Sequence, residues 1–319
     1  MIEASKAEVG SIDACSKPLD LSVQLGRLHL KNPVLVASGT FGYAREMAGV
    51  ISLPELGGIL PKTITQSPRP GNAPWRTVET SAGLLNAIGL DNDGIDYFLA
   101  NHWPYLKSTG SQIIVSIAGK SKEEFVGLAN RLNEADGIHA VELNVSCPNV
   151  SGGIDFGTDP KLCYDVVSSV REALHCPIIT KLTPNVTRIV DIARAAKEAG
   201  TDAVTCINTV LGMAVDWRKQ KPMLSNIVGG LSGPAIKPIA LRCVYQVATQ
   251  VGVPVIGVGG IANLDDCMEF FIAGASAIQI GTANYYDPLA SIKILRELPD
   301  ALAILGAKSI REIVGTLKT

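Results

Sequence analysis

The sequence has few charged and few aromatic residues, and it contains no long hydrophobic segment. Charged residues make up 18% and aromatic residues 5% of the 319 residues, and the formal net charge is −2. The sequence shows no basic stripe of the kind that binds nucleic acid. Its apolar runs all fall short of the roughly 20 residues that cross a bilayer. We therefore expect neither a nucleic-acid partner nor a membrane partner.

The cysteines and histidines are few and scattered. The seven cysteines include no C-x-x-C pair, and they form no cluster with the four histidines at metal-ligand spacing. The sequence thus predicts no metal site, no iron–sulfur cluster held by this chain and no disulfide framework, which favours a reducing, cytoplasmic location. Residues 1–17 carry acidic residues and no apolar block. We expect them to form a flexible leader, not a secretory signal, ahead of a single domain spanning residues 18–319.

The sequence is rich in apolar segments that alternate with helical segments. Continuous Val- and Ile-rich runs are typical of parallel strands that are covered on both faces. Eight such units predict an α/β fold of the (β/α)8 TIM barrel type. A short alternating pair, 21–25 and 28–30, predicts a β-hairpin ahead of the barrel. A long insertion after the second barrel strand, which includes 86–90, is expected to contribute loops over the barrel mouth. The predicted barrel strands are 33–38, 58–62, 112–118, 140–145, 177–182, 203–208, 253–258 and 277–281.

A glycine motif at 257–262 raises a rival fold. It matches the G-x-G-x-x-A pattern of dinucleotide-binding sheets. However, only one predicted strand follows it, whereas a dinucleotide domain needs further βαβ units downstream. In a barrel the same glycines follow the seventh strand, where phosphate sites are built from main-chain N–H groups. The motif therefore predicts a phosphate site in a barrel.

A polar cluster around Cys147 lies where the fourth predicted strand ends. Pro148 cannot donate to a strand ladder, so Asn144, Cys147 and Asn149 stand at the carboxyl end of that strand. Ligands bind at this end of parallel α/β folds. A free cysteine usually packs as a small hydrophobe, and the cysteines at 163, 176, 206, 243 and 267 fit that reading. The setting of Cys147 favours a functional role instead.

Other polar residues are expected at the same edge of the barrel. All four histidines lie away from the predicted strand ends, so a thiolate nucleophile would lack a partner base. The Cys147 thiol is better suited to accept a proton in a closed site. A strand lysine such as Lys181 is rarely buried without a reason, and facing a ligand anion would supply one. The residues at or after the other strand ends are Ser38, Lys62, Thr63, Ser116, Lys181, Asn208, Thr209, Gly259, Gly260, Gly281 and Thr282.

Four segments together resemble the class 1 dihydroorotate dehydrogenases. They are N-A-I-G-L at 86–90, N-V-S-C-P-N at 144–149, K-L-T-P-N-V-T at 181–187 and G-G-L-S-G-P-A-I-K-P at 229–238. The resemblance runs from about residue 21 to near the C-terminus. Class 1 enzymes carry cysteine at the base position, whereas class 2 enzymes carry serine and an apolar amino-terminal helix. Residues 147–160 resemble the corresponding segment of the NAD-linked 1B subclass more closely than that of the fumarate-linked 1A subclass.

The resemblance implies a flavoenzyme that oxidises (S)-dihydroorotate to orotate in de novo pyrimidine (UMP) biosynthesis. It implies Cys147 as the base, Lys62 as the partner of the substrate carboxylate and Lys181 as the group that stabilises reduced flavin. The implied FMN positions are Ser38, Lys62, Thr63, Ser116 (usually asparagine in related 1B sequences), Asn144, Lys181, Ile207 and Gly233, with Gly259, Gly260, Gly281 and Thr282 at the phosphate. The implied substrate positions are Lys62, Asn86, Ala87, Ile88, Gly89, Leu90, Asn144, Asn149, Asn208 and Thr209.

The resemblance also implies partners. Class 1B enzymes are homodimers of this chain flanked by two subunits that carry FAD and a [2Fe–2S] cluster and reduce NAD⁺, giving a heterotetramer. Alternatives remain open: a fumarate-linked 1A enzyme, a dihydropyrimidine dehydrogenase-like reductase, a Schiff-base aldolase using Lys181, or a non-catalytic phosphate-binding barrel. The dihydropyrimidine dehydrogenases share K-L-T-P-N-V-T but typically have histidine at the position of Asn149. The absorption spectrum of bound flavin would exclude the aldolase and the non-catalytic barrel.

Overall fold

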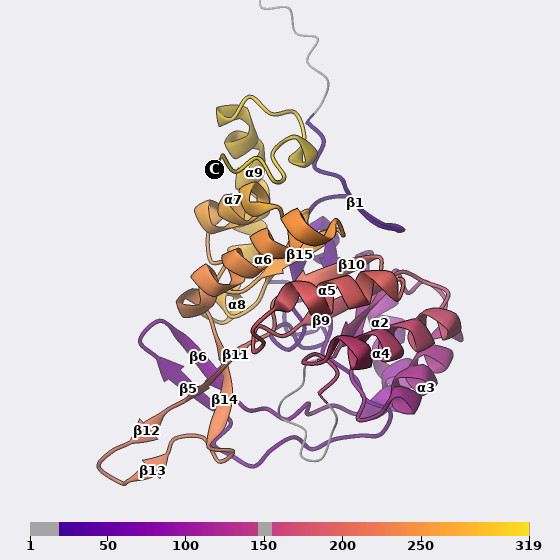
Figure 1. Ribbon diagram of the computed structural model, residues 1–319, viewed down its shortest axis with the longest axis vertical. Helices are drawn as coiled ribbons and strands as arrows, with labels where there is room; N and C mark the ends of the chain where they lie inside the picture. Colours follow the sequence, from indigo (N-terminus) through magenta and orange to yellow (C-terminus); the bar gives the residue numbers. More distant parts are fainter. Residues whose placement is uncertain (1–18, 146–154, 319) are drawn as a thin grey trace, which may run out of the picture.

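The computed structural model describes residues 19–145 and 155–318, and its centre is a parallel eight-stranded barrel (Figure 1). Neighbouring strands follow the order β4-β3-β16-β15-β10-β9-β8-β7. The ring closes where Ile59 bridges to Ile113 and its N–H donates to the Gln112 carbonyl at 2.8 Å. The predicted (β/α)8 barrel is confirmed. Its strands are β3 (Val34–Val36), β4 (Gly58–Ile59), β7 (Ile114–Ile117), β8 (Ala140–Asn144), β9 (Ile178–Leu182), β10 (Ala203–Cys206), β15 (Val255–Val258) and β16 (Ala277–Ile280).

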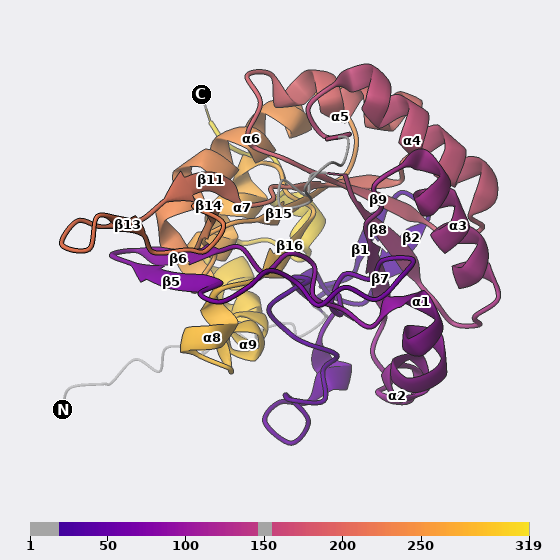
Figure 2. The same cartoon turned by 90° about the horizontal axis from the view of Figure 1, so that it is seen from below.

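Helices cover the outside of the barrel, and Figure 2 shows them as an arc around the strands. Because every residue of β3 is fully buried, this strand has apolar neighbours on both faces, as its Val-Leu-Val sequence predicts. The Asp159 side chain caps α4 by accepting from the Leu162 N–H at 2.9 Å, and Pro160 occupies the first turn. The outer helices are α3 (Lys122–Asn133), α4 (Pro160–Ala173), α5 (Ile189–Glu198), α6 (Lys237–Val251), α7 (Leu264–Ala273) and α9 (Ala290–Ile304).

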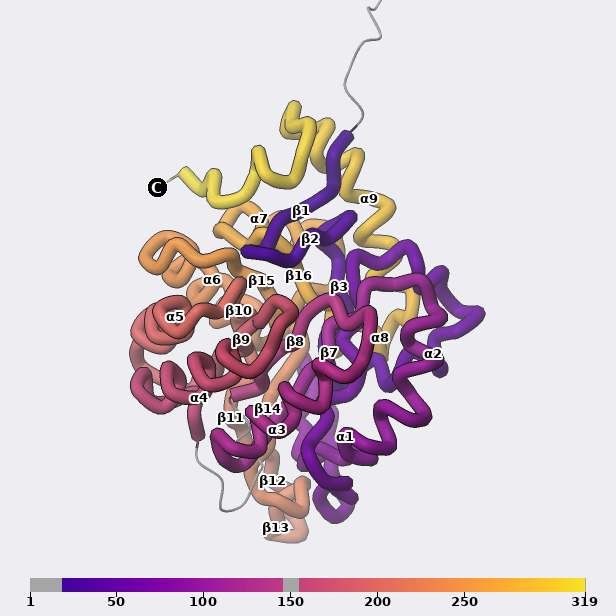
Figure 3. The backbone as a smooth tube through the Cα atoms, turned by 90° about the vertical axis from the view of Figure 1, so that its right-hand side faces the viewer, coloured from indigo at the N-terminus to yellow at the C-terminus, as the bar shows by residue number. Residues whose placement is uncertain are grey.

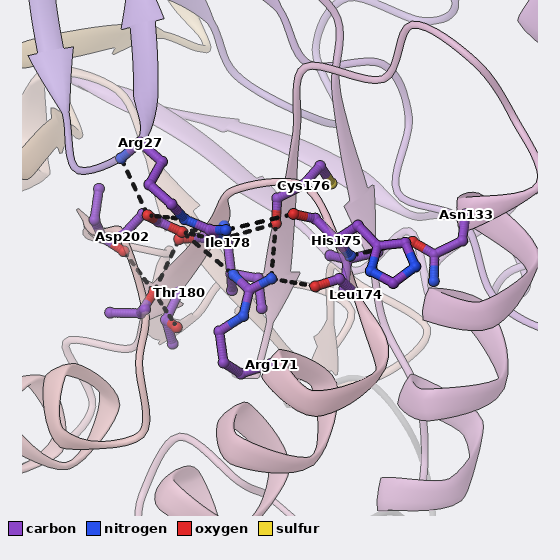
Figure 4. Close-up of polar contacts among 11 residues, drawn as sticks. Arg27, Asn133, Arg171, Leu174, His175, Cys176, Ile178, Thr180 and Asp202 are labelled. Atoms are coloured by element: carbon purple, nitrogen blue, oxygen red, sulfur yellow. Dashed lines mark hydrogen bonds and ion pairs between the residues drawn. The ribbon is translucent and has the colours of Figure 1, made fainter.

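The predicted hairpin, β1 (Val23–Leu25) and β2 (Leu28–Leu30), is tied to the amino-terminal end of the barrel. Arg27 donates to both carboxylate oxygens of Asp202 at 2.9 Å, and Arg171 approaches the same carboxylate at 3.4 Å (Figure 4). Asp202 also accepts from the Ile178 N–H at 2.9 Å. Burial raises the pKa of Asp202, but these hydrogen bonds outweigh it and the pKa lies below its ordinary 3.8. Asp202 therefore joins the hairpin, α4 and β9.

Asp202→Asn is expected to lower the free energy of unfolding by about 2 kcal/mol, since the buried hydrogen bonds lose their charge. Because the folded-state pKa is depressed, the contribution is complete above about pH 4 and is lost as the pH falls through the folded-state pKa. Urea unfolding of the wild type and of Asp202→Asn, at pH 7 and at lower pH, measures this difference in the free energy of unfolding. Asp191→Asn, which removes exposed ion pairs with Arg188 and Arg194, is the control with little effect. Equal losses of unfolding free energy in Asp202→Asn and Asp191→Asn would contradict the role of Asp202 in joining the hairpin to the barrel.

A second, antiparallel sheet in the order β11-β14-β6-β5 lies at the opposite end of the barrel from the hairpin (Figures 1 and 3). The insertions expected as loops over the barrel mouth are present, and they form strands. These are β5 (Thr77–Thr80), β6 (Gly83–Asn86), β11 (Val210–Met213) and β14 (Val228–Ser232), with β12 (Val215–Asp216) and β13 (Lys221–Pro222) at the tip. The remaining helices are η1 (Leu53–Glu55), α1 (Gly94–Tyr97), η2 (Phe98–His102), α2 (Trp103–Ser108), η3 (Pro234–Ile236), α8 (Ala283–Tyr286) and η4 (Ile310–Glu312).

Two features are absent from residues 19–145 and 155–318. No helix in these ranges is both long and apolar enough to span a bilayer. The same residues include no group of three or more His, Cys, Asp or Glu side chains placed to hold a metal ion.

Candidate functional site

A cavity of about 380 Å³ opens at the carboxyl ends of the barrel strands, beneath the second sheet. Its size is in the range of small-molecule and cofactor sites. Segments far apart in the sequence line it together because the carboxyl ends of all parallel strands meet at one end of a barrel. The predicted site residues that line it are Ser38, Lys62, Thr63, Asn86, Ile88, Gly89, Leu90, Asn144, Lys181, Ile207, Asn208, Thr209, Gly233, Gly259, Gly260, Gly281 and Thr282.

Four predicted residues are not among those that line this cavity. Ser116 is fully buried behind Thr63, with their hydroxyl oxygens 2.8 Å apart. Ala87 is fully buried in a small apolar cluster of the second sheet. Cys147 and Asn149 lie outside the described residues, as does the leader at 1–17. Any contact of Ser116 with a ligand in the cavity would therefore pass through Thr63.

Three basic side chains and one carboxylate contribute to the lining. Arg76 and Asp91 form an ion pair at 3.0 Å, so their charges largely offset each other. Lys181 is only 6% exposed and lies 3.7 Å from the Glu142 carboxylate. Within residues 19–145 and 155–318, Lys62 forms no ion pair. Lys62 is thus the cation with no counter-charge in the described part of the cavity, which suits it to an anionic ligand.

Amide groups form a second feature of the cavity. The Asn208 side-chain NH₂ donates to the Asn144 side-chain oxygen at 3.2 Å. Asn185, outside the lining, donates to the Thr209 carbonyl at 3.1 Å and accepts from the Leu211 N–H at 2.9 Å. The segment at 208–211 is therefore held by Asn144, at the end of β8, and by Asn185, in the loop after β9. Fixed amides of this kind can recognise the polar edge of a planar ring, because a ring with a different pattern of donors and acceptors forms fewer hydrogen bonds with them.

The glycine turn after β15 brings main chain directly to the cavity. Gly259 and Gly260 have φ values of +129° and +79°. A Cβ at Gly260 would lie 2.8 Å from the Lys237 Cβ and 2.9 Å from the Gly233 carbonyl oxygen. Asp266 holds the following turn by accepting from the Ala262 N–H at 2.9 Å. This side-chain-free cradle fits a phosphate group such as that of a flavin mononucleotide.

Several residues of the site carry no recognisable sequence signal. Tyr285 lines the cavity and donates to the Gly39 carbonyl at 3.0 Å, and Ser232 accepts from Thr282 at 2.8 Å. Arg76 and Asp91 belong to the long insertion, whose fold the sequence does not predict. Glu142 did carry a signal, since it is an acidic residue in the middle of an apolar strand.

Five cysteines of the described chain are unsuited to act as thiolates. Burial raises the pKa of Cys163 to about 12 and that of Cys176 to about 11. Burial also raises the pKa of Cys243, and it holds the pKa values of Cys206 and Cys267 well above the ordinary range. Their expected packing role is consistent with this.

The chain is similar to one protein family along nearly its whole length. The family model described as Dihydroorotate dehydrogenase matches residues 20–302. Proteins named "Dihydroorotate dehydrogenase B (NAD(+)), catalytic subunit" from Bacteroides thetaiotaomicron and Geobacter sulfurreducens are each 50% identical over 300 residues. That alignment covers 94% of this chain and 99% and 98% of theirs. A protein of the same name from Geotalea uraniireducens is 48% identical over 301 residues, or 94% of this chain and 99% of the relative.

Proposed function

The chain belongs to the dihydroorotate dehydrogenase family, and we propose that it is the catalytic subunit of a B-type, NAD-linked enzyme. It oxidises (S)-dihydroorotate to orotate in de novo pyrimidine biosynthesis. The observation that carries this function is the near-full-length identity to B-type catalytic subunits, joined to a cavity that has the lysines and amides for an anionic planar ring. The same two observations favour this reading over a Schiff-base aldolase or a non-catalytic barrel.

One FMN per chain fits the cavity in our proposal. The main chain at Gly259, Gly260, Gly281 and Thr282 would hold its phosphate. Protein atoms already occupy the positions where a Cβ on Gly259 or Gly260 would lie, so only a bare main chain fits at this edge of the cavity. FMN, when bound, supplies the hydride acceptor of the reaction. The ring would lie against the remaining lining residues of the flavin set, which are Ser38, Lys62, Thr63, Asn144, Lys181, Ile207 and Gly233.

Binding and proton transfer would fall to residues of this chain. Lys62 binds the substrate carboxylate through a charge-assisted contact, and Asn144 and Asn208 read the amide edges of the ring. Cys147 takes the proton from C5 of dihydroorotate as general base. Lys181 provides a positive charge beside the ring, and preorganised charge of this kind is often the largest catalytic contribution.

The electrons leave through a partner. The word "subunit" in the relatives' names and the resemblance to class 1B support a homodimer of this chain flanked by two FAD/[2Fe–2S] subunits. NAD⁺ is then the terminal acceptor, and the assembly is cytoplasmic. FAD and the cluster belong to the partner in this proposal.

The test is the spectrum and substrate range of the purified chain. We expect a yellow dimer with bound FMN that reduces an artificial dye with dihydroorotate, and that reduces NAD⁺ only after the FAD/[2Fe–2S] subunit is added. Brisk NAD⁺ reduction by the chain alone would overturn the partner assignment, and fumarate as the preferred acceptor would favour the 1A type. Faster turnover with dihydrouracil would favour a pyrimidine reductase. A colourless protein that borohydride traps with its substrate would favour the aldolase.

A further inference from the structure

Glu142 is a buried carboxylate inside the barrel. It lies in β8, two residues before Asn144, so both side chains point to the same face of the strand, the barrel interior. Glu142 is fully buried, and its Oε2 accepts from the Thr205 hydroxyl at 2.9 Å and from the Gln279 side-chain N–H at 2.7 Å. Residues from β10 and β16 therefore fix the carboxylate from across the barrel.

The second oxygen of Glu142 faces the cavity lysine. Lys181 Nζ lies 3.7 Å from Glu142 Oε1, a distance that allows charge attraction but is too long for a hydrogen bond. Oε1 has no hydrogen-bond partner among the described residues. Lys181 sits on β9 beside Asn144 and lines the cavity. Its ammonium thus stands between a fixed carboxylate and the cavity, with its N–H groups not used by that carboxylate.

Fold stability alone does not account for this arrangement. Burying two charges costs more than their attraction returns unless the geometry is close, and apolar replacements of such pairs are often neutral or stabilising. The Lys181 and Glu142 charges are 3.7 Å apart, and Lys181 lies at the floor of the cavity. Their charges therefore act on a ligand bound in the cavity.

We propose that Glu142 is a positioning residue that acts through Lys181: it holds the lysine ammonium at the cavity floor and offsets its charge, so that the buried pair sets the reduction potential of the bound flavin. The inference rests on the proposed function. With both residues present, the net charge below the ring is zero. The other charged groups that line the cavity, Lys62 and the paired Arg76 and Asp91, are left unchanged by substitutions at Glu142.

Glu142→Gln keeps the shape of the side chain and removes its charge, which leaves Lys181 uncompensated. Two-electron reduction adds negative charge to the flavin, so the reduced form gains stability in the variant. We expect the equilibrium between bound FMN and a reference dye to shift at least tenfold toward reduced FMN, a rise of about 30 mV for a two-electron couple. Lys181→Met with Glu142 intact is expected to shift the potential in the opposite direction.

The experiment measures the potential of FMN bound to the full chain by anaerobic equilibration with a reference dye. Asp202→Asn is the matched control, since it also neutralises a buried carboxylate but at the opposite end of the barrel. An unchanged potential in Glu142→Gln, or an equal shift in Asp202→Asn, would overturn the proposal. Should Glu142→Gln fail to fold, Glu142→Asp moves the carboxylate back by one methylene and should raise the potential by a smaller amount, and no rise would overturn it. A chain that binds no FMN would instead contradict the proposed function.

Discussion

Cys147→Ala is expected to lower the rate of flavin reduction by dihydroorotate by about a thousandfold, the usual range for loss of a general base. Asn144, which ends β8 and precedes Cys147 by three positions in the sequence, lines the cavity. The histidines do not line the cavity, and among the described residues none offers an alternative imidazole base there. The loss should therefore not be recovered by a neighbouring group.

Stopped-flow measurement of flavin reduction isolates this step from the partner subunit. Cys147→Ser should retain a slow reaction, because an alcohol has a much higher pKa than a thiol and is far less often in the deprotonated form that accepts the proton. Cys163→Ala is the control: this buried thiol in α4 has a pKa near 12 and lies away from the cavity lining, so the rate should change little. A wild-type rate in Cys147→Ala, with FMN bound, would show that another group takes the proton.

The sequence predicted the barrel and the position of its mouth because both depend on local patterns. Each barrel strand is a continuous apolar run, as in β9, where all five residues are buried. Parallel strands bring their carboxyl ends to one edge, so polar residues that follow separate runs could be placed together before their geometry was known. That rule located Lys62, Lys181 and Asn208 in one cavity.

The second sheet escaped prediction because its pairing joins distant segments of unusual composition. β14 contains Gly229 and Gly230, residues that weaken a strand pattern, yet it pairs with β6 about 140 residues earlier. The glycines are required by close approach: a Cβ at Gly230 would lie 2.0 Å from the Thr209 hydroxyl, and one at Gly229 would lie 2.6 Å from the Asn86 carbonyl. Only the folded arrangement reveals that requirement.

Glu142 shows the same limit within the site. Its position in an apolar strand marks it as unusual, but its partners come from β10 and β16, and strand register across a barrel cannot be read from a single strand. Ser116 and Ala87 illustrate the opposite case. Ala87 belongs to a segment that lines the cavity, but it is buried in a small apolar cluster of the second sheet. Ser116 lies in β7, which contributes no residue to the lining, and its hydroxyl pairs with that of Thr63.

Lys181→Met is expected to lower the free energy of unfolding of the FMN-free chain by about 3 kcal/mol, because it leaves the buried Glu142 carboxylate without its counter-charge. Adding Glu142→Gln should recover most of this loss, since the paired residues couple and the double variant buries no unmatched charge. Flavin reduction should not recover: both variants should be slower than wild type by about a hundredfold, the range seen when one preorganised charge or donor is removed.

Thermal unfolding of the four proteins of this cycle, with stopped-flow reduction of their bound FMN, separates the two roles of the lysine. Restored stability without restored rate would mean that the fold requires only that the two buried charges match, while the lysine charge itself serves the reaction. If the double variant is no more stable than Lys181→Met, the 3.7 Å separation is too long for the two charges to stabilise each other in the folded chain. The coupling that links Glu142 to the cavity would then be absent.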